Sequence, residues 1–448
     1  MKGFAISQKL LYSVVISGTL LFLSEICRAQ AIWDKVKSTH ELADMHYEEG
    51  NYEKAIELYR HLVINQKANN TVFVRLGRMS YALNDYKTSV KWFERYKNTT
   101  PLTQDDLLMY ANALAGTGRL SEAADTYTSY MDKYGTNDWL ALKVWRLNNL
   151  SYLYEDSLTY SVKPTSVNSE FSEIPMAYYN DGLLFISDRD QSFQAKNHTT
   201  KSTGRSPYAL YQTVNLWPST STSLQKVEIE PSNLIRKGGY HVAGLSFSEN
   251  DGQMVYAKNV KMADDLKQPL QLFTKSIEES TEGKRIGFGE SKFSIKHPSI
   301  SPDGNTLYFS AELPDSYGGF DLYKSNHSNG TWSEPVNLGP SINTPGNEAF
   351  PFMHKSGVLY FSSDGLPGFG GYDLFKIDIN NTTAEPQNMG YPLNSSADDF
   401  SLILNGIGDR GHFASNRRMG GLNDDIFVVE IDLQEYPLTI KGLLKFKN

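Results

Sequence analysis

Three aspartates at a fixed spacing are the first residues of this sequence whose type and position could do chemistry. Asp321, Asp373 and Asp425 lie 52 residues apart, and the first two follow a Gly-Gly-aromatic triplet. Their carboxylate oxygens could bind a hard cation such as calcium. They could also accept backbone N–H bonds and fix a turn. Because the residue recurs at the same place in each copy, we predict the structural role.

No catalytic constellation accompanies these aspartates. His40-Glu41 would begin a zinc-protease helix only with histidine at position 44, where this chain has Asp44. Gly244-Leu-Ser-Phe-Ser lacks the last glycine of a nucleophile elbow, and no phosphate-cradling glycine loop with a lysine occurs. Arg417, Arg418 and His412 could line a rim, although a solvated loop is the simpler interpretation. We therefore predict no enzyme, no bound metal and no cofactor.

The aspartates mark a repeated segment. Short aromatic runs at 301–310, 354–363 and 410–415 precede them, and weaker copies contain 182–189 and 252–257. A period of this size with short strands and Gly, Asn and Pro turns is typical of a propeller blade. The sequence therefore predicts a five-bladed, WD-like β-propeller over residues 156–433.

Each blade can be divided into strands, as the third copy illustrates. We expect an inner strand near 298–301, a tight turn at Pro302-Asp303-Gly304, a second strand at 307–310 and a third from Asp321. Asp303 is thus a fourth structural marker. Asn168 matches Asn343 and Asn394 in the segments that join blades. We therefore expect 158–162 to be the outer strand of the last blade and to close the ring.

A second repeat, with a period of 34 residues, precedes the propeller. Its columns are Gly50, Asn84 and Gly118; Ala55, Ser89 and Ala123; Tyr59, Phe93 and Tyr127; and Tyr52, Tyr86 and Leu120. Small residues let paired helices approach, and aromatic residues fill the space between units. This pattern resembles the tetratricopeptide repeat. It predicts three helix pairs between about 35 and 136 and a covering helix at 138–154, so that the chain is an α plus all-β multidomain protein with a helical solenoid at 30–155.

Such a solenoid has a concave face lined by the first helix of each pair. The resemblance projects eight residues onto that face: His40, Asp44, Tyr47, Val74, Arg78, Tyr81, Leu108 and Asn112. They are our candidate partner-binding residues. The alternative is that this face packs on the propeller.

The first 29 residues have the features of a secretory signal peptide. Lys2 and Lys9 precede an apolar run at 10–23, and small residues follow. We expect cleavage after Ala29, with lipid attachment at Cys27, the only cysteine, as the alternative. The net charge of −8 argues against nucleic-acid binding.

The propeller residues carry a further resemblance. Ser301-Pro302-Asp303-Gly304 with Gly318-Gly319-Phe320-Asp321-Leu322-Tyr323 resembles the TolB-type propeller repeat. Tetratricopeptide repeats followed by this propeller resemble the OmpA-family envelope proteins of Bacteroidota, which include a periplasmic component of the type IX secretion and gliding machinery. In that family a carboxypeptidase regulatory-like sandwich and a peptidoglycan-binding OmpA-like domain follow. Residues 434–448 are similar to the first strand of that sandwich or form a tail, and an OmpA-like domain is not in the sequence.

The resemblance implies a non-enzymatic periplasmic scaffold, associated with the outer membrane. Its partners would be an outer-membrane protein of the PorP/SprF type or subunits of the secretion machinery, and direct peptidoglycan binding is not expected without the OmpA-like domain. One alternative is a glycan- or peptide-binding protein that uses the propeller channel, and another is a propeller hydrolase. Function within the propeller would lie where the copies differ, at 191–206, 259–267 and 417–423.

Overall fold

The computed structural model describes residues 37–136, 138–155, 157–189, 205–214, 228–235, 241–249, 252–259, 269–288, 292–418 and 423–432. The predicted signal peptide with Cys27, the segment 434–448 and most of the three variable segments lie outside these residues. Among the described residues, no helix is both long and apolar enough to cross a membrane.

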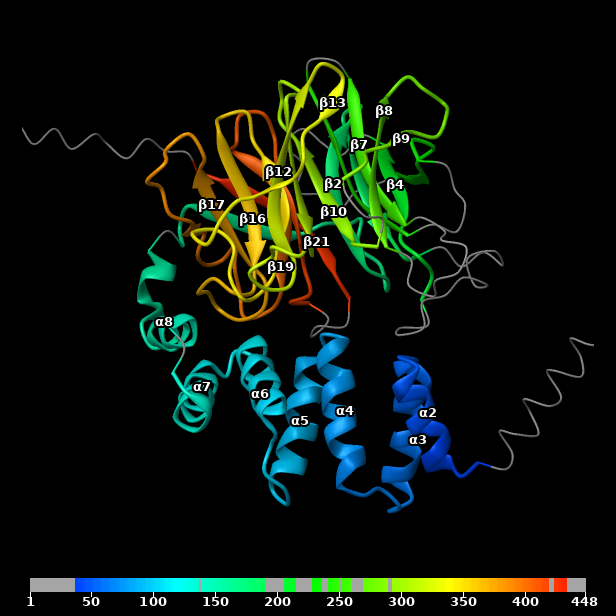
Figure 1. The fold of residues 1–448 in the computed structure, drawn as a ribbon, viewed down its shortest axis with the longest axis vertical. Coiled ribbons are helices and arrows are strands. Elements are labelled where there is room, and N and C mark those ends of the chain that lie inside the picture. Colours follow the sequence, from blue (N-terminus) through cyan, green and yellow to red (C-terminus); the bar gives the residue numbers. More distant parts are fainter. Residues whose placement is uncertain are drawn as a thin grey trace, which may run out of the picture.

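The N-terminal part, which we call the helical segment, is a row of antiparallel helices (Figure 1). Its helices are α2 (Thr39–Glu48), α3 (Tyr52–Ile64), α4 (Asn70–Ala82), α5 (Tyr86–Lys97), α6 (Gln104–Gly116), α7 (Leu120–Tyr134) and α8 (Asp138–Leu147), followed by the 3-10 helix η1 (Leu150–Tyr154). The helices therefore form the three predicted pairs and a final helix, although this last α-helix ends at Leu147 and not at Tyr154 as predicted.

The repeat columns have distinct physical roles in these pairs. Gly50, Asn84 and Gly118 all have positive φ, between 57° and 76°, in the turn between the two helices of a pair. Glycine and asparagine are the residues that adopt this conformation most readily. The columns of small and aromatic residues, from Ala55 and Tyr59 onwards, are fully buried.

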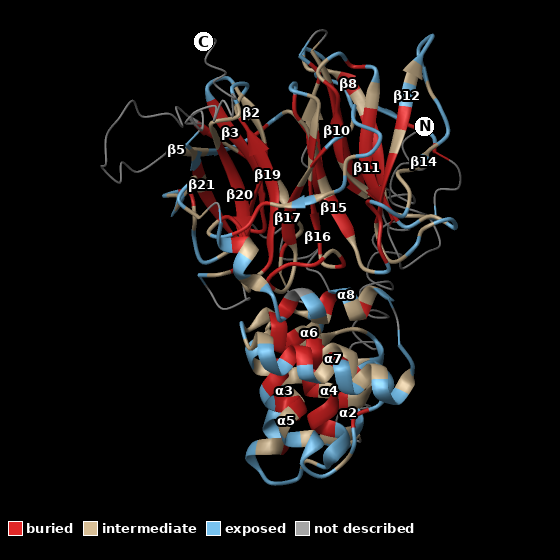
Figure 2. Cartoon of the chain, turned by 90° about the vertical axis from the view of Figure 1, so that its left-hand side faces the viewer, coloured by how far each residue is buried: buried red, intermediate tan, exposed pale blue. Residues whose placement is uncertain are grey.

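The rest of the chain forms five sheets of short strands arranged around a centre (Figures 1 and 2). The first blade is β2 (Glu173–Tyr179), β3 (Gly182–Ser187), β4 (Ala209–Val214) and β5 (Glu228–Pro231); the second is β6 (Val242–Phe247), β7 (Gln253–Asn259), β8 (Leu270–Ser276) and β9 (Lys284–Arg285). The third is β10 (Ile295–Ile300), β11 (Thr306–Ala311), β12 (Asp321–Ser328), β13 (Thr331–Trp332) and β14 (Val336–Asn337). The fourth is β15 (Glu348–Met353), β16 (Val358–Ser363), β17 (Asp373–Asp378) and β18 (Gln387–Asn388).

The fifth blade closes the ring with the two ends of the propeller. It contains β19 (Asp399–Leu404), β20 (Arg410–Ser415), β21 (Asp425–Ile431) and, as its outer strand, β1 (Tyr160–Pro164). The predicted closure is confirmed, although the strand begins two residues later than expected. Leu158 is 96% exposed and precedes it.

The asparagine markers and the aspartates Asp303, Asp321 and Asp373 have the expected structural roles, whereas Asp425 is fully buried and lies 3.5 Å from Arg418 without a turn-capping bond among the described residues. Asn343 and Asn394 each bridge the backbone of the neighbouring strand, at Leu322 and Leu374, and Asn168 does the same at Ile426. Asp321 accepts from the Tyr317 N–H at 2.8 Å, and Asp373 from the Phe369 N–H at 2.7 Å. Asp303 accepts from the Asn305 N–H in its hairpin turn. These carboxylates therefore cap turns.

Candidate functional site

The predicted concave face of the helical segment is largely open. The side chains of His40, Asp44 and Arg78 retain 32%, 39% and 36% of their surface, and Tyr47 and Leu108 are half-buried. Val74 was wrongly placed on this face, because the structure buries it against α5 and α6 in the core. We call the open residues His40, Asp44, Tyr47, Arg78 and Leu108 the groove.

The charges of the groove are paired within it. Arg78 donates to both oxygens of Asp106, at 2.6 and 2.9 Å. Burial raises the pKa of Asp106, but the hydrogen bonds and charge of Arg78 together with the hydrogen bonds from Thr103 outweigh burial and leave the pKa lowered. Arg75 pairs with Asp44 and also donates to Tyr59 at 2.8 Å. The groove therefore presents fixed, hydrogen-bonded charges.

The helical segment packs on the propeller through the start of α5 and through α8, and not through the groove. The Tyr86 hydroxyl, at the start of α5, donates to Asp398 at 3.3 Å. Trp139 of α8 donates from Nε1 to the Gly365 carbonyl at 2.6 Å, and Lys143 donates to the Asp364 carbonyl at 3.2 Å. Figures 1 and 2 show the helix ends lying against one end of the propeller. We call that end the docked face and the opposite end the open face.

Tyr81, one of the predicted groove residues, lies near Asp364 and Asp398 of the propeller, and Asn112 is bonded to it within the helical segment. Asn112 donates to the Tyr81 hydroxyl at 3.1 Å and accepts from Tyr127. Burial, opposed by the hydrogen bond from Asn112, raises the pKa of Tyr81 to about 12. On the propeller side, burial raises the pKa of Asp398 to about 6. The interface thus surrounds an acidic group with tyrosines.

Helix α8 docks where the fourth blade differs from the first and fifth. In those two blades a buried acid at the start of the inner strand pairs with an arginine that follows the second strand: Glu173 with Arg189, and Asp399 with Arg417. The equivalent position of the fourth blade is Gly365, where an added Cβ would collide with the Thr344 hydroxyl. The acid there is Glu348, whose donors among the described residues, from Thr344 and Ser363, are all neutral, and burial raises its pKa to about 7.

This pairing corrects the interpretation of Arg417 and His412. Arg417 lies over the Phe413 and Phe427 rings and donates to the carbonyls of Pro392 and Leu393. His412 is buried, and burial lowers its pKa to about 3. Both are internal structural groups, so neither a rim nor a solvated loop describes them.

A cleft of 820 Å³ separates α3 and the α4–α5 turn from the first blade. Its described lining includes Glu57, Arg60 and Ile64 on one side and Tyr208 and His241 on the other. Residues 190–204, which join β3 to β4, lie outside the described part of the chain. We therefore draw no function from this cleft.

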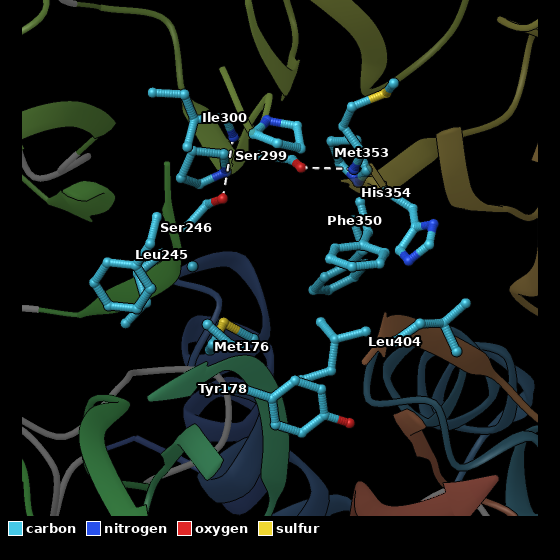
Figure 3. Close-up of a pocket in the computed structure, with 18 of the residues that line it drawn as sticks. Met176, Tyr178, Leu245, Ser246, Ser299, Ile300, Phe350, Met353, His354 and Leu404 are labelled. Carbon is cyan, nitrogen blue, oxygen red and sulfur yellow. Dashed lines mark hydrogen bonds between the residues drawn. The ribbon is translucent and has the colours of Figure 1, made fainter. Parts of the chain in front are cut away.

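The second hollow with the features of a site, a pocket of 310 Å³, lies in the centre of the propeller (Figure 3). All five inner strands contribute to it, through residues in their second halves. It therefore opens toward the open face, away from the helices. The side chains that surround it are mainly apolar: Met176, Leu245, Phe247, Ile300, Phe350, Met353 and Leu404.

The floor of this central pocket is built by a bulge that recurs in every inner strand. The register shifts lie between Pro175 and Ala177 in the first blade and at equivalent places in the others. His297, Phe350 and Ser401 have φ near +50° there. The His297 and Phe350 rings stack at 3.7 Å, and burial lowers the pKa of His297 well below its ordinary value. The floor is therefore aromatic and uncharged.

The serine hydroxyls of the central pocket already have partners within the propeller. Ser246 accepts from the Ile300 N–H and Ser299 from the Met353 N–H, at 3.1 and 2.8 Å, as the dashed lines in Figure 3 mark. Ser401 donates to the Pro175 carbonyl. A ligand here would find few polar groups able to bind it without losing an existing hydrogen bond.

Sequence reasoning named the channel but none of these pocket residues. A signal exists, because Gly244, His297 and Phe350 lie 53 residues apart. Because these three residues differ in chemistry, their equivalence cannot be recognised from the sequence. It becomes clear only when the inner-strand bulges of the structure are superimposed. Among the described residues, no group of three or more His, Cys, Asp or Glu side chains could hold a metal ion.

Comparisons with known proteins leave the family open. No family model matches the chain, and no curated protein does. Solved structures that resemble it include a putative TolB from Agrobacterium tumefaciens, with 14% identity, a TM-score of 0.33 and coverage of 57% of this chain and 76% of that one. Another is an endo-arabinase from Bacteroides thetaiotaomicron VPI-5482, with 15% identity, a TM-score of 0.37 and coverage of 60% and 96%. A third is a GH43 β-xylosidase/α-arabinofuranosidase from a compost microbial metagenome, with 12% identity, a TM-score of 0.38 and coverage of 60% of this chain and 95% of that one. Similarity at this level identifies neither a family nor an activity.

Proposed function

We propose that this chain is a non-enzymatic binding scaffold in which a tetratricopeptide-type solenoid presents its groove to a protein partner. The observation that carries the proposal is the way the two parts meet. The start of α5 and helix α8 pack on the propeller, so the groove remains open. The partly exposed Arg78 guanidinium, which the buried Asp106 holds in place, is suited to selecting a partner by electrostatic complementarity.

The cellular setting of the scaffold is part of the proposal and rests on the sequence resemblance. We propose that the protein lies in the periplasm at the outer membrane, within or beside a type IX secretion or gliding assembly. A PorP/SprF-type membrane protein or a secretion subunit is the proposed partner. The predicted signal peptide supports export.

Site-specific crosslinking in cells tests the groove. A photoreactive amino acid replaces His40 or Leu108 in the groove, and Lys87 on the exposed outer face of α5 serves as the matched control. We expect one defined envelope protein to be crosslinked from the two groove positions and not from Lys87. Equal crosslinking from Lys87, or none from the groove, would contradict the proposal.

The second candidate function is ligand binding in the central pocket. It is favoured by one observation, namely that all five blades contribute side chains to a single hollow of 310 Å³. A peptide end or a glycan are the two ligand classes considered. Binding there is compatible with the scaffold role, because the pocket and the groove are on different parts of the molecule.

A further inference from the structure

The rim of the central pocket is predominantly acidic. The hairpins that join the inner to the second strand surround the open face, and three of the five carry an exposed acid: Asp181, Glu249 and Asp303. Asp409 in the fifth blade is half-buried and accepts from the Asn405 side chain. The fourth blade carries Lys355 instead. Glu249 and Lys355 line the pocket directly. The rim would therefore attract positive charge.

The rim acids are exposed, and Asp303 also accepts hydrogen bonds from Ser301 and Asn305 within its own hairpin. Asp181, Glu249 and Asp303 are exposed on hairpin tips. The Ser301 hydroxyl lowers the pKa of Asp303, so that this carboxylate stays ionised at neutral pH. Below the rim the surface changes to apolar side chains over an uncharged aromatic floor.

From the acidic rim and the apolar pocket below it, we infer that the open face binds a polypeptide segment in which a bulky apolar side chain is flanked by lysine or arginine. The apolar side chain enters the pocket, and the flanking cations meet the acidic hairpin tips. This inference rests on the proposed role as a binding protein and names the ligand class of its second candidate site. It is independent of the groove, so either can fail without the other.

The apolar lining of the pocket and its already bonded polar groups disfavour a glycan as the ligand. A sugar presents many hydroxyl groups, and each would need a hydrogen-bond partner on desolvation. The serines of the pocket wall are committed to backbone groups of neighbouring blades, and His354 is bonded to Ser356 and to the Asn405 carbonyl. An apolar side chain makes no such demand, and its burial is favourable.

Fluorescence anisotropy with the purified full chain tests the inference. The probe is a short labelled peptide with phenylalanine between two lysines. We expect saturable binding that weakens as the salt concentration rises from about 50 to about 300 mM, because the rim charges are exposed. Replacing the phenylalanine by serine should weaken binding about ten-fold or more, since the buried apolar surface is lost. Replacing the lysines by glutamates should also weaken it.

Two variants of the rim should change the peptide affinity in opposite directions. A loss of folding would lower the affinity in both. Glu249→Gln should weaken binding roughly two- to five-fold, and Lys355→Glu should strengthen it by a similar factor. Asp125→Asn, an exposed acid on α7, is the matched control and should leave binding unchanged. Met353→Trp should abolish binding by filling the pocket; if it fails to fold, the Lys355 variant remains decisive.

Several outcomes would overturn the inference. They are no binding at peptide concentrations up to about 1 mM, equal binding of the glutamate peptide, or no response to the Glu249 and Lys355 changes. Competition by xylotriose would also overturn it, because the site would then be a glycan site. Groove crosslinking is scored separately, so a negative result here leaves the scaffold proposal to its own test.

Discussion

At the scale of single residues, the propeller depends on buried carboxylates that begin inner strands. Glu173, Glu348 and Asp399 are fully buried, and each accepts from the hydroxyl and N–H of the residue four positions earlier. Arginines compensate two of them. Glu348 has no arginine partner among the described residues, so its ionisation is costly for the folded state.

Glu348→Gln tests this cost through the pH dependence of stability. Burial raises the folded-state pKa of Glu348 to about 7, above its ordinary value near 4.5. A raised carboxyl pKa gives stability that is present below pH 4.5 and lost as pH rises through 7. The free energy of unfolding of the wild type, relative to the variant, should therefore fall by something on the order of 3 kcal/mol across this window.

Urea denaturation of both proteins at several pH values provides the measurement. Glu334→Gln, at an exposed position of the third blade, is the matched control and should follow the wild type throughout. A constant difference between wild type and Glu348→Gln would show that Glu348 titrates normally.

At the scale of elements, the ring is closed by one strand that comes from the other end of the chain. Five residue pairs, from Tyr160 with Ile431 to Pro164 with Phe427, join β1 to β21. Without β1 the fifth blade would expose the edge of β21. Unpaired edges of this kind promote association between chains.

Deletion of residues 156–166 should therefore open the ring. We expect loss of cooperative unfolding and aggregation, measured by thermal melting and by light scattering. Shortening the β12–β13 hairpin is the control, because β13 pairs only with the last two residues of β12. A soluble truncated protein that still unfolds cooperatively would contradict the closure.

At the scale of the whole molecule, the helical segment and the propeller form one body through the docked face. Trp139 and Lys143 of α8 reach the fourth blade, and Tyr86 reaches Asp398 in the segment before β19. Gly370 also contributes, because a Cβ there would lie 2.9 Å from the Ala115 carbonyl. The interface thus holds the helices by their ends and leaves the groove and the open face free for partners.

Trp139→Ala should separate the unfolding of the two parts. Loss of the indole and its hydrogen bond should cost roughly 2–4 kcal/mol of interface stability. Calorimetry should then show two transitions where the wild type shows one. Trp145→Ala on the same helix is the matched control, since that side chain is 57% exposed. A single transition in the Trp139 variant would mean that the docking does not couple the parts.

The sequence by itself determined both repeat architectures. The columns at 34 residues and the aspartates at 52 residues express constraints that act within one helix pair or one blade. Positive φ at Gly50, a buried Tyr59 and a turn capped by Asp321 each depend on neighbours a few residues away or in the next copy. Local constraints repeat with the sequence and can therefore be recognised in it.

Only the tertiary structure decided where a partner could bind. Val74 is not part of the groove because packing between helix pairs buries it, and Tyr81 lies near Asp364 and Asp398 of the propeller with Asn112 bonded to it. The central pocket combines unlike residues, such as Met176, His297 and Phe350, from blades far apart in sequence. Such surfaces arise from how whole elements pack, which no single spacing along the chain records.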